Sequence, residues 1–542
     1  MSKKSFLTGA AILGAAGLLV QVMGAIFRIP LANIIGEVGM GYFQTAYPVY
    51  IFLLVFSTNG APAAISKMTS ERIATGDYDD AHRVFKLAFI VMLIFGVFAA
   101  AGIAALAGPI STAVKSEGSY YSLLAIAPAL LFVPIMSVFR GYFQGMQEMR
   151  PTALSQLTEQ AVRVAIGLGL AVLLMPSSQE AASAGACVGA SIGPVAGVIM
   201  LAAVYFKKRK SILENVRNAG RQRHREKGRK KHRERAGGIF TELVTLTIPT
   251  TVGISILPIM NLADMALCRV RLIDSGFAAS EAEGLYGLMA GFAAPIINLP
   301  MALALSIALS MIPAVAAAGS TNDKLFINEN ISMGLRTAMI VGTPCSFGLI
   351  VLAEPIMRLI YPAFREEAGS AAMCLMILAA GVIFLCVAQT MVGILQGMSR
   401  AGLPVLSLLV GVAVKTVLTY GLTGITALNI NGATIGSTVG YAVICFMNVM
   451  FVKRITGVKF DVGLAVMKPL ISGIVMSLAV VAVYFICSMA LSLNLSALPA
   501  ICAGAVVYVL MILKTKAIQP HEIKRLPKGD RVLSILEKLR LA

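Results

Sequence analysis

The chain has 542 residues, of which 58% are apolar and only 13% are charged, and its formal net charge is +19. A soluble domain carries about 25% charged residues, so this composition excludes an ordinary soluble protein. Apolar runs long enough to cross a bilayer recur along almost the whole chain, which is the signal of transmembrane helices. The sequence therefore predicts an all-α integral membrane protein.

Hydropathy predicts about fourteen transmembrane spans, each helical because lipid offers no hydrogen-bond partner to an open backbone. The first apolar run follows Lys3 and Lys4 and could be a cleaved signal peptide, but it continues to Ile26, so we interpret it as a retained helix. The eight cysteines are scattered singly, which indicates neither a disulfide frame nor a zinc site. The expected spans are 5–29, 41–66, 84–108, 120–143, 152–176, 184–206, 239–263, 284–312, 334–355, 371–395, 402–424, 432–452, 466–489 and 494–513.

Two pairs of matching stretches predict an internal duplication. Gln144–Arg163 and Gln396–Lys415 both open with Gln-Gly-Met, carry an early proline, and end in Ala-Val and a cation, at an offset of 252 residues. GACVGASIG at 185–193 and GATIGSTVG at 432–440 match at an offset of 247. Two six-helix lobes in parallel repeat, plus two C-terminal helices, are expected. The predicted organisation is an N-terminal lobe at 1–206, a basic linker at 207–238, a C-terminal lobe at 239–453, two further spans at 454–513 and a basic tail at 514–542.

The distribution of lysine and arginine predicts the orientation in the membrane. With the N-terminus in the cytoplasm, the cytoplasmic segments, 140–150 among them, hold 37 of the 45 lysines and arginines. The outer loops then hold five, at Lys115, Arg269, Arg271, Arg358 and Arg365. We therefore expect a multi-pass protein of a bacterial plasma membrane with both termini cytoplasmic.

The densest charge lies at 207–235, with 14 basic and 3 acidic residues. A nucleic-acid-binding arm is one interpretation of such a run. Because the run adjoins a predicted span on the cytoplasmic side, we favour a disordered or partly helical linker bound to anionic inner-leaflet lipids, and no nucleic-acid partner.

Ionisable side chains inside spans are costly and therefore functional candidates. Arg163 and Lys415 lie 12 and 11 residues past the prolines that open their spans, about 17 Å along a helix and close to the bilayer midplane. Glu159 precedes Arg163 by four residues, the favourable order for an ion pair on one helix face. Lys415 has no such acid in its own helix. Both cations could form structural ion pairs or line an aqueous substrate cavity.

Other polar residues interrupt the apolar spans. Arg28 lies near the end of the first span, where Pro30 is expected to break or bend the helix. Asp264, in the seventh span, aligns within one residue of Arg28 and would place an opposite charge near the outer mouth. Polar side chains beside prolines and glycines in the second and eighth spans are further cavity candidates: Gln44, Asn59 and Asn298.

No catalytic constellation appears in the sequence. It contains no GxxxxGK[ST] loop, GxSxG or HExxH motif, and its four histidines are expected in cytoplasmic loops. The chain is therefore not expected to be an enzyme, to bind a cofactor or to use bound ATP.

The stretch FRIPLANIIGEVGMGYFQTAYPVY at 27–50, the Gln-Gly-Met span ends and the arrangement of six, six and two helices resemble the multidrug/oligosaccharidyl-lipid/polysaccharide flippase superfamily. The resemblance covers the whole chain and is strongest to its polysaccharide-transporter branch, the branch of stage V sporulation protein B and the MurJ-type lipid II flippases. It implies a flippase with a cationic cavity between two lobes. The implied substrate is an undecaprenyl-diphosphate-linked cell-wall precursor, lipid II in particular, with its lipid tail in a groove formed by the last two spans.

The resemblance also implies site residues. Relatives use arginines in spans one, two and eight. Arg28 matches the first, but the other two spans contain no internal arginine here, so Arg163 and Lys415 are expected to share the role. Some relatives couple transport to a sodium ion held by an acid in span seven, for which Asp264 is the candidate. We hypothesise that the Lys415 ammonium replaces this metal, with the membrane potential or a sodium or proton gradient as the energy source.

Two other functions stay open. A multidrug or organic-cation antiporter of the same fold would need an excess of intramembrane acids, whereas cations exceed acids here. A non-transporting scaffold would recruit cell-wall synthases through the basic linker and tail.

Overall fold

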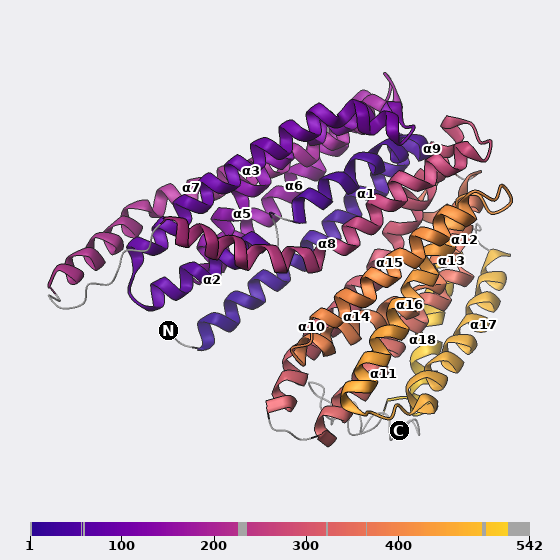
Figure 1. Cartoon of the computed structure of the whole chain (residues 1–542). Helices are drawn as coiled ribbons and strands as arrows, with labels where there is room; N and C mark the ends of the chain where they lie inside the picture. Colours follow the sequence, from indigo (N-terminus) through magenta and orange to yellow (C-terminus); the bar gives the residue numbers. More distant parts are fainter. Residues whose placement is uncertain are drawn as a thin grey trace. The chain divides into compact units, whose positions relative to one another are not determined.

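The computed structural model describes residues 3–55, 57, 60–225, 236–320, 324–364, 366–489 and 495–518. These residues form long helices joined by short turns, with no strand among them (Figure 1). The candidate residue Asn59, the linker residues 226–235 and most of the basic tail lie outside this part of the chain. The first-half α-helices are α1 (Lys3–Val55), α2 (Ala61–Ala74), α3 (Tyr78–Ala113), α4 (Tyr120–Ile126), α5 (Ala129–Gly145), α6 (Met149–Leu174), α7 (Gln179–Arg225) and α8 (Ala236–Asp274).

The remaining α-helices are α9 (Ala279–Gly287), α10 (Ala294–Ser320), α11 (Lys324–Val351), α12 (Ala353–Ile360), α13 (Ala368–Ala380), α14 (Val382–Gly397), α15 (Gly402–Thr423), α16 (Asn431–Thr456), α17 (Lys468–Ser488) and α18 (Ala497–Lys514). Short non-α turns connect some of them, at η2 (Glu117–Ser119), η3 (Leu288–Ala293) and η4 (Gly463–Met467).

Twelve helices in the described part of the chain are long and apolar enough to cross a membrane. The first of these, Ile12–Val55, has 44 residues, about 66 Å of helix against a hydrocarbon core of about 30 Å. It overlaps both of the first two predicted spans, 5–29 and 41–66. In α8, the residues Ala236–Thr247 form a shorter apolar helix. The all-α membrane fold is confirmed, and the predicted fourteen spans are compatible with it.

The break in α1 lies at a glycine rather than at the expected proline. The helix continues through Pro30, and its non-helical residue is Gly36, with φ 73° and ψ −174°. Glycine reaches positive φ without a steric cost because it has no Cβ. A proline inside a helix removes one hydrogen bond and crowds the carbonyl four residues earlier, but transmembrane helices tolerate it because neighbouring groups satisfy the freed backbone. The chain turns at Gly36 instead.

The described residues pack as two compact units. The first contains 1–270 with 278–287, and the second contains 271–277 with 288–542. Most of α8 and all of α9 thus pack with the N-terminal helices, although the repeat assigned 239–453 to the second lobe. Packing and repeat are different criteria, so the lobe boundaries stay a prediction.

In the first unit, α6 packs along α7 through glycines. A Cβ built on Gly189 would lie 2.8 Å from the Arg163 carbonyl oxygen, and one on Gly193 would lie 3.2 Å from the Arg163 Cβ. Small residues at four-residue spacing let two helices approach closely in lipid.

In the second unit, α15 packs along α16 through the same contacts. A Cβ on Gly436 would lie 3.1 Å from the Lys415 carbonyl oxygen, and one on Gly440 would lie 3.1 Å from the Lys415 Cβ. The residues in contact in one unit correspond to those in contact in the other, at the sequence offsets of 252 and 247 residues. The internal duplication is therefore confirmed in three dimensions.

The glycines of α5 and α14 repeat the pattern. Each faces a backbone carbonyl of the neighbouring helix, α2 in the first unit and α10 in the second. The pairs are Gly141 with Pro62, Gly145 with Ser66, Gly393 with Ala308 and Gly397 with Ile312.

We predict that Gly189→Ala and Gly436→Ala both lower the melting temperature in detergent. The added methyl would press on backbone atoms of the neighbouring helix, and overpacking of this kind costs about 1–3 kcal/mol. Gly169→Ala and Gly421→Ala are repeat-matched controls, with no atom within 4 Å of the added Cβ. They should melt at or slightly above wild type because alanine favours helix by up to about 1 kcal/mol. An equal loss of melting temperature in all four variants would refute the glycine-mediated packing of these two helix pairs.

Candidate functional site

A polar stripe runs along one face of α6. Gln156, Glu159, Gln160 and Arg163 are spaced by three and four residues, which places them on the same side of the helix. An ionised group costs several kcal/mol in a membrane unless it is paired or wetted, so the partners of Glu159 and Arg163 determine what the stripe can do.

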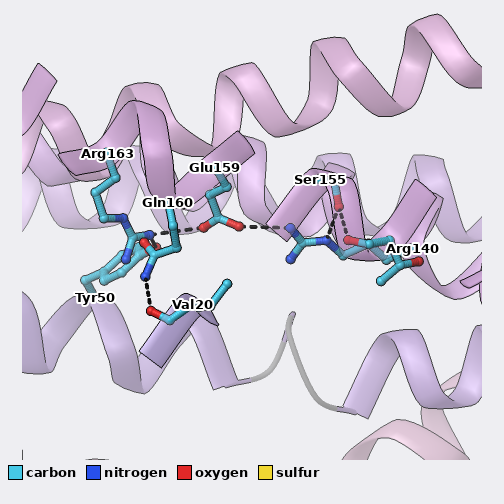
Figure 2. Close-up of polar contacts among 8 residues, drawn as sticks. Val20, Tyr50, Arg140, Ser155, Glu159, Gln160 and Arg163 are labelled. Carbon is cyan, nitrogen blue, oxygen red and sulfur yellow. Dashed lines mark hydrogen bonds and ion pairs between the residues drawn. The ribbon is translucent and has the colours of Figure 1, made fainter. Parts of the chain in front are cut away.

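One carboxylate is shared by two arginines (Figure 2). Arg163 Nη2 lies 3.1 Å from Glu159 Oε1, and Arg140 Nη2, from α5, lies 2.9 Å from Oε2. Arg140 Nε also donates to Ser155 Oγ at 2.9 Å. The three ionised side chains are only 11–13% exposed. The group carries one net positive charge in a mostly buried setting, and we call it the arginine cluster (Arg140, Glu159, Arg163).

The Glu159–Arg163 pair is thus confirmed, while Arg140 was missed. Its segment was counted as cytoplasmic, yet Arg140 falls inside the predicted span 120–143. That position was the available signal. The pairing itself spans 19 residues and two helices, and no spacing rule within one helix predicts it.

Arg163 also contacts α1. Its Nη2 donates to the Tyr50 hydroxyl at 3.3 Å, whereas its Nε has no hydrogen-bond partner among the described residues. The rings of Tyr50 and Tyr47 lie 5.9 Å apart, and the guanidinium of Arg28 stacks on Tyr47 at 4.9 Å from the ring centre. Two tyrosines therefore connect the predicted site residue Arg28 to the arginine cluster.

α6 is tied to the first part of α1 as well. Gln160 Nε2 donates to the Val20 carbonyl oxygen at 3.4 Å (Figure 2). The amide oxygens of Gln156 and Gln160 are buried without a hydrogen-bond partner in the described part of the chain. The polar stripe therefore retains acceptors and donors that the structure does not use.

The other predicted site residues are dispersed. Gln44 is buried, and its carbonyl oxygen accepts a hydrogen bond from the Tyr286 hydroxyl at 3.2 Å. Asp264 is half-buried on α8 in the first unit. In the second unit, Asn298 is exposed on α10 and Lys415 is 3% exposed on α15. Their roles in binding stay predictions.

One kind of metal site can be searched for among the described residues. No group of three or more His, Cys, Asp or Glu side chains that could hold a metal ion occurs among them. Asp264 as a ligand for a coupling cation stays a prediction.

Arg269 is a second residue that the sequence misplaced. It was expected in an outer loop, but α8 continues to Asp274 and buries Arg269 completely. Its Nη1 lies 2.9 Å from Glu283 Oε1 on α9 and 2.6 Å from Thr45 Oγ1 on α1, and its guanidinium lies over Tyr286 at 4.5 Å. A charge count assigns such an arginine to water, because it cannot detect an acid 14 residues away.

The second unit lacks the arginine cluster. At the repeat offset of 252, Arg140 corresponds to Val392 and Glu159 to Gly411. In each unit a large side chain on one helix lies against a glycine on the other. In the first unit Glu159 faces Gly197, whose added Cβ would lie 3.7 Å from Glu159 Cβ. In the second unit the large residue is Ile444, the counterpart of Gly197, and a Cβ on Gly411 would collide with it. The same helix pair therefore packs with or without the ions, so packing alone does not require them.

The cluster is suited to anion recognition. A guanidinium offers five donors in a planar fork that matches phosphate and carboxylate oxygens, and such charge-assisted bonds are stronger than neutral ones. Glu159 neutralises only one of the two cations. The site can therefore bind an anion with two or more acceptor oxygens.

A separate apolar groove lies within the second unit. It has a volume of about 330 Å³. Hydrocarbon side chains dominate its lining, so it is suited to an apolar chain rather than to a charged group. α10, α11, α12, α17 and α18 contribute Ile296, Leu299, Pro300, Pro344, Cys345, Gly348, Leu349, Leu352, Ile356, Met476, Val480, Ile501, Gly504 and Ala505.

Comparison with known sequences finds relatives from Bacillus subtilis. Stage V sporulation protein B is 27% identical, with 98% of this chain and 100% of that protein covered. The lipid II flippase MurJ is 27% identical, with 85% of each chain covered.

Comparison with solved structures identifies the fold. A lipid II flippase MurJ in an inward closed conformation matches with a TM-score of 0.69 at 15% identity, covering 92% of this chain and 98% of that one. An inward-facing multidrug resistance MATE family transporter of the MOP superfamily also gives 0.69, at 13% identity, covering 81% and 94%.

A family model described as polysaccharide biosynthesis protein matches residues 6–319, which is more than half of the chain. The resemblance expected from the 27–50 stretch and the Gln-Gly-Met repeats is thereby confirmed. The chain is a multi-pass membrane protein of the polysaccharide biosynthesis protein family.

Proposed function

We propose that this protein is a flippase that moves an undecaprenyl-diphosphate-linked cell-wall precursor, lipid II, from the inner to the outer leaflet by alternating access. The observation that carries the proposal is the arginine cluster, in which two mostly buried arginines share one carboxylate. A diphosphate crossing hydrocarbon needs desolvated cations, and arginine forks match its oxygens.

The apolar groove supports a lipid-linked substrate. A polyprenyl tail is pure hydrocarbon and needs packing surface rather than polar partners. Its lining atoms are almost all apolar, and in lipid such association depends on close van der Waals packing. The groove between α11, α17 and α18 is therefore the proposed place for the tail.

Charge separates this function from organic-cation antiport. The MurJ and MATE structures match with the same TM-score of 0.69, so the fold does not choose between them. The arginine cluster carries net positive charge, which repels an organic cation and attracts a diphosphate.

A scaffold for cell-wall synthesis would need the basic linker rather than buried arginines. Deletion of 215–235 should abolish function in a scaffold and spare it in a flippase.

The proposal extends to the membrane context. The lysine and arginine distribution supports a location in a bacterial plasma membrane with both termini cytoplasmic. Residues 207–235 would bind anionic inner-leaflet lipids, and cell-wall synthases are proposed partners. The membrane potential or a sodium or proton gradient would supply the energy, with no bound cofactor.

We predict that Arg140→Gln and Arg163→Gln each reduce translocation at least tenfold, because each removes charge-assisted hydrogen bonds contributing about 1.5–3 kcal/mol. The test is depletion of the native protein, complementation by each variant, and measurement of lipid-linked precursor on each leaflet. Lys67→Gln is the control because Lys67 is 56% exposed and pairs with Glu71 in the next turn of its own helix. Normal translocation after depletion without complementation would refute the flippase function.

We also predict that Gly348→Phe slows translocation without lowering the melting temperature. Gly348 lines the apolar groove, and the nearest atom to an added Cβ is Met476 Cε at 3.9 Å, so the ring would occupy the groove itself. Gly102→Phe is the control, since nothing lies within 4 Å of its added Cβ on α3. If Gly348→Phe translocates the precursor at the wild-type rate, the lipid tail does not bind in this groove.

A further inference from the structure

We propose that Glu159 is an internal counter-anion, which occupies the arginine pair in the absence of substrate and which the substrate's diphosphate displaces. This inference rests on the proposed flippase function and assigns a step within it. Glu159 then sets how tightly the diphosphate is held and how quickly it leaves.

The geometry of the carboxylate imitates that of a phosphate. Each oxygen serves a different guanidinium, Oε1 for Arg163 at 3.1 Å and Oε2 for Arg140 at 2.9 Å. A diphosphate also presents oxygens in separate directions, with more acceptors and more charge. It can therefore replace the carboxylate at both arginines.

The arginines have donors to spare. Each gives Glu159 one N–H in the structure, whereas a guanidinium has five. Arg163 Nε has no hydrogen-bond partner among the described residues. A ligand with more acceptors than a carboxylate would satisfy donors that Glu159 leaves open, which is the driving force for the exchange.

The helix pair does not need the carboxylate for packing. Gly411 holds the equivalent position in the second unit, and Ile444 fills the space from the neighbouring helix. Only the side chain of Glu159 would move, because its carbonyl oxygen is fixed against α7 by Gly193, whose added Cβ would lie 2.7 Å away.

Competition by Glu159 for the two arginines would help the bound diphosphate to dissociate. Two unpaired guanidinium groups in a low-dielectric site would be strongly destabilising, and they would hold a diphosphate too firmly for turnover. A carboxylate that returns when the substrate leaves keeps the arginines paired at every stage. It lowers the net affinity because binding the diphosphate requires breaking the existing ion pairs.

The test measures binding of undecaprenyl diphosphate, without sugar, to the full-length protein in lipid nanodiscs. Glu159→Gln should bind at least tenfold more tightly than wild type and dissociate more slowly, with a lower translocation rate. Glu71→Gln removes one carboxylate that is 56% exposed and should leave both affinity and translocation unchanged. Equal or weaker binding by Glu159→Gln would show that Glu159 is only a structural tie.

A second variant covers the case in which Glu159→Gln does not fold. Glu159→Asp keeps the charge but is one methylene shorter, so it cannot reach both arginines; it should bind more tightly than wild type by a smaller factor. Binding equal to or weaker than wild type would overturn the inference while leaving the flippase function intact if wild type binds and translocates. No binding by any of these proteins would overturn both.

Discussion

A charge inside the hydrocarbon must be paired, and this constraint organises the first unit of the protein. Glu159 pairs with two arginines at once, one on its own helix and one on α5, and Arg163 extends the network to Tyr50 on α1. Three helices are thereby joined around a group that is mostly buried yet positively charged. A net buried charge costs stability unless an anion neutralises it. This cost is consistent with the proposed binding of an anionic substrate at the arginine cluster.

The duplication provides an internal comparison. Both units pack a helix pair through glycines at matching steps, and both carry a cation at the matching position, Arg163 or Lys415. Only the first unit has the acid and the second arginine, because Val392 and Gly411 replace them in the second. One copy has kept or gained an ionic site, while the other fills the same space with hydrocarbon and offers an apolar groove between its last helices.

The sequence predicted features that depend on spacing within one helix or on repetition. The membrane class, the duplication and the Glu159–Arg163 pair are of this kind. Arg140 and Arg269 were misplaced because their partners come from other helices, and a charge count near a span end assigns such residues to water. The break in α1 was expected at Pro30, but a membrane helix tolerates proline, and the chain turns at Gly36, where glycine adopts a positive φ without a steric cost. Asn59 lies outside the described residues.

We propose that the arginine cluster serves transport and not packing. Transplanting the second unit's residues into the first tests this most directly, through Met136→Ala, Arg140→Val, Glu159→Gly and Gly197→Ile, which copy Ala388, Val392, Gly411 and Ile444. The measurement combines the melting temperature with translocation of lipid-linked precursor in reconstituted vesicles. We expect this variant to fold, with a melting temperature lowered because Arg163 loses its carboxylate partner, and to translocate no precursor. Wild-type translocation by this variant would contradict the proposal.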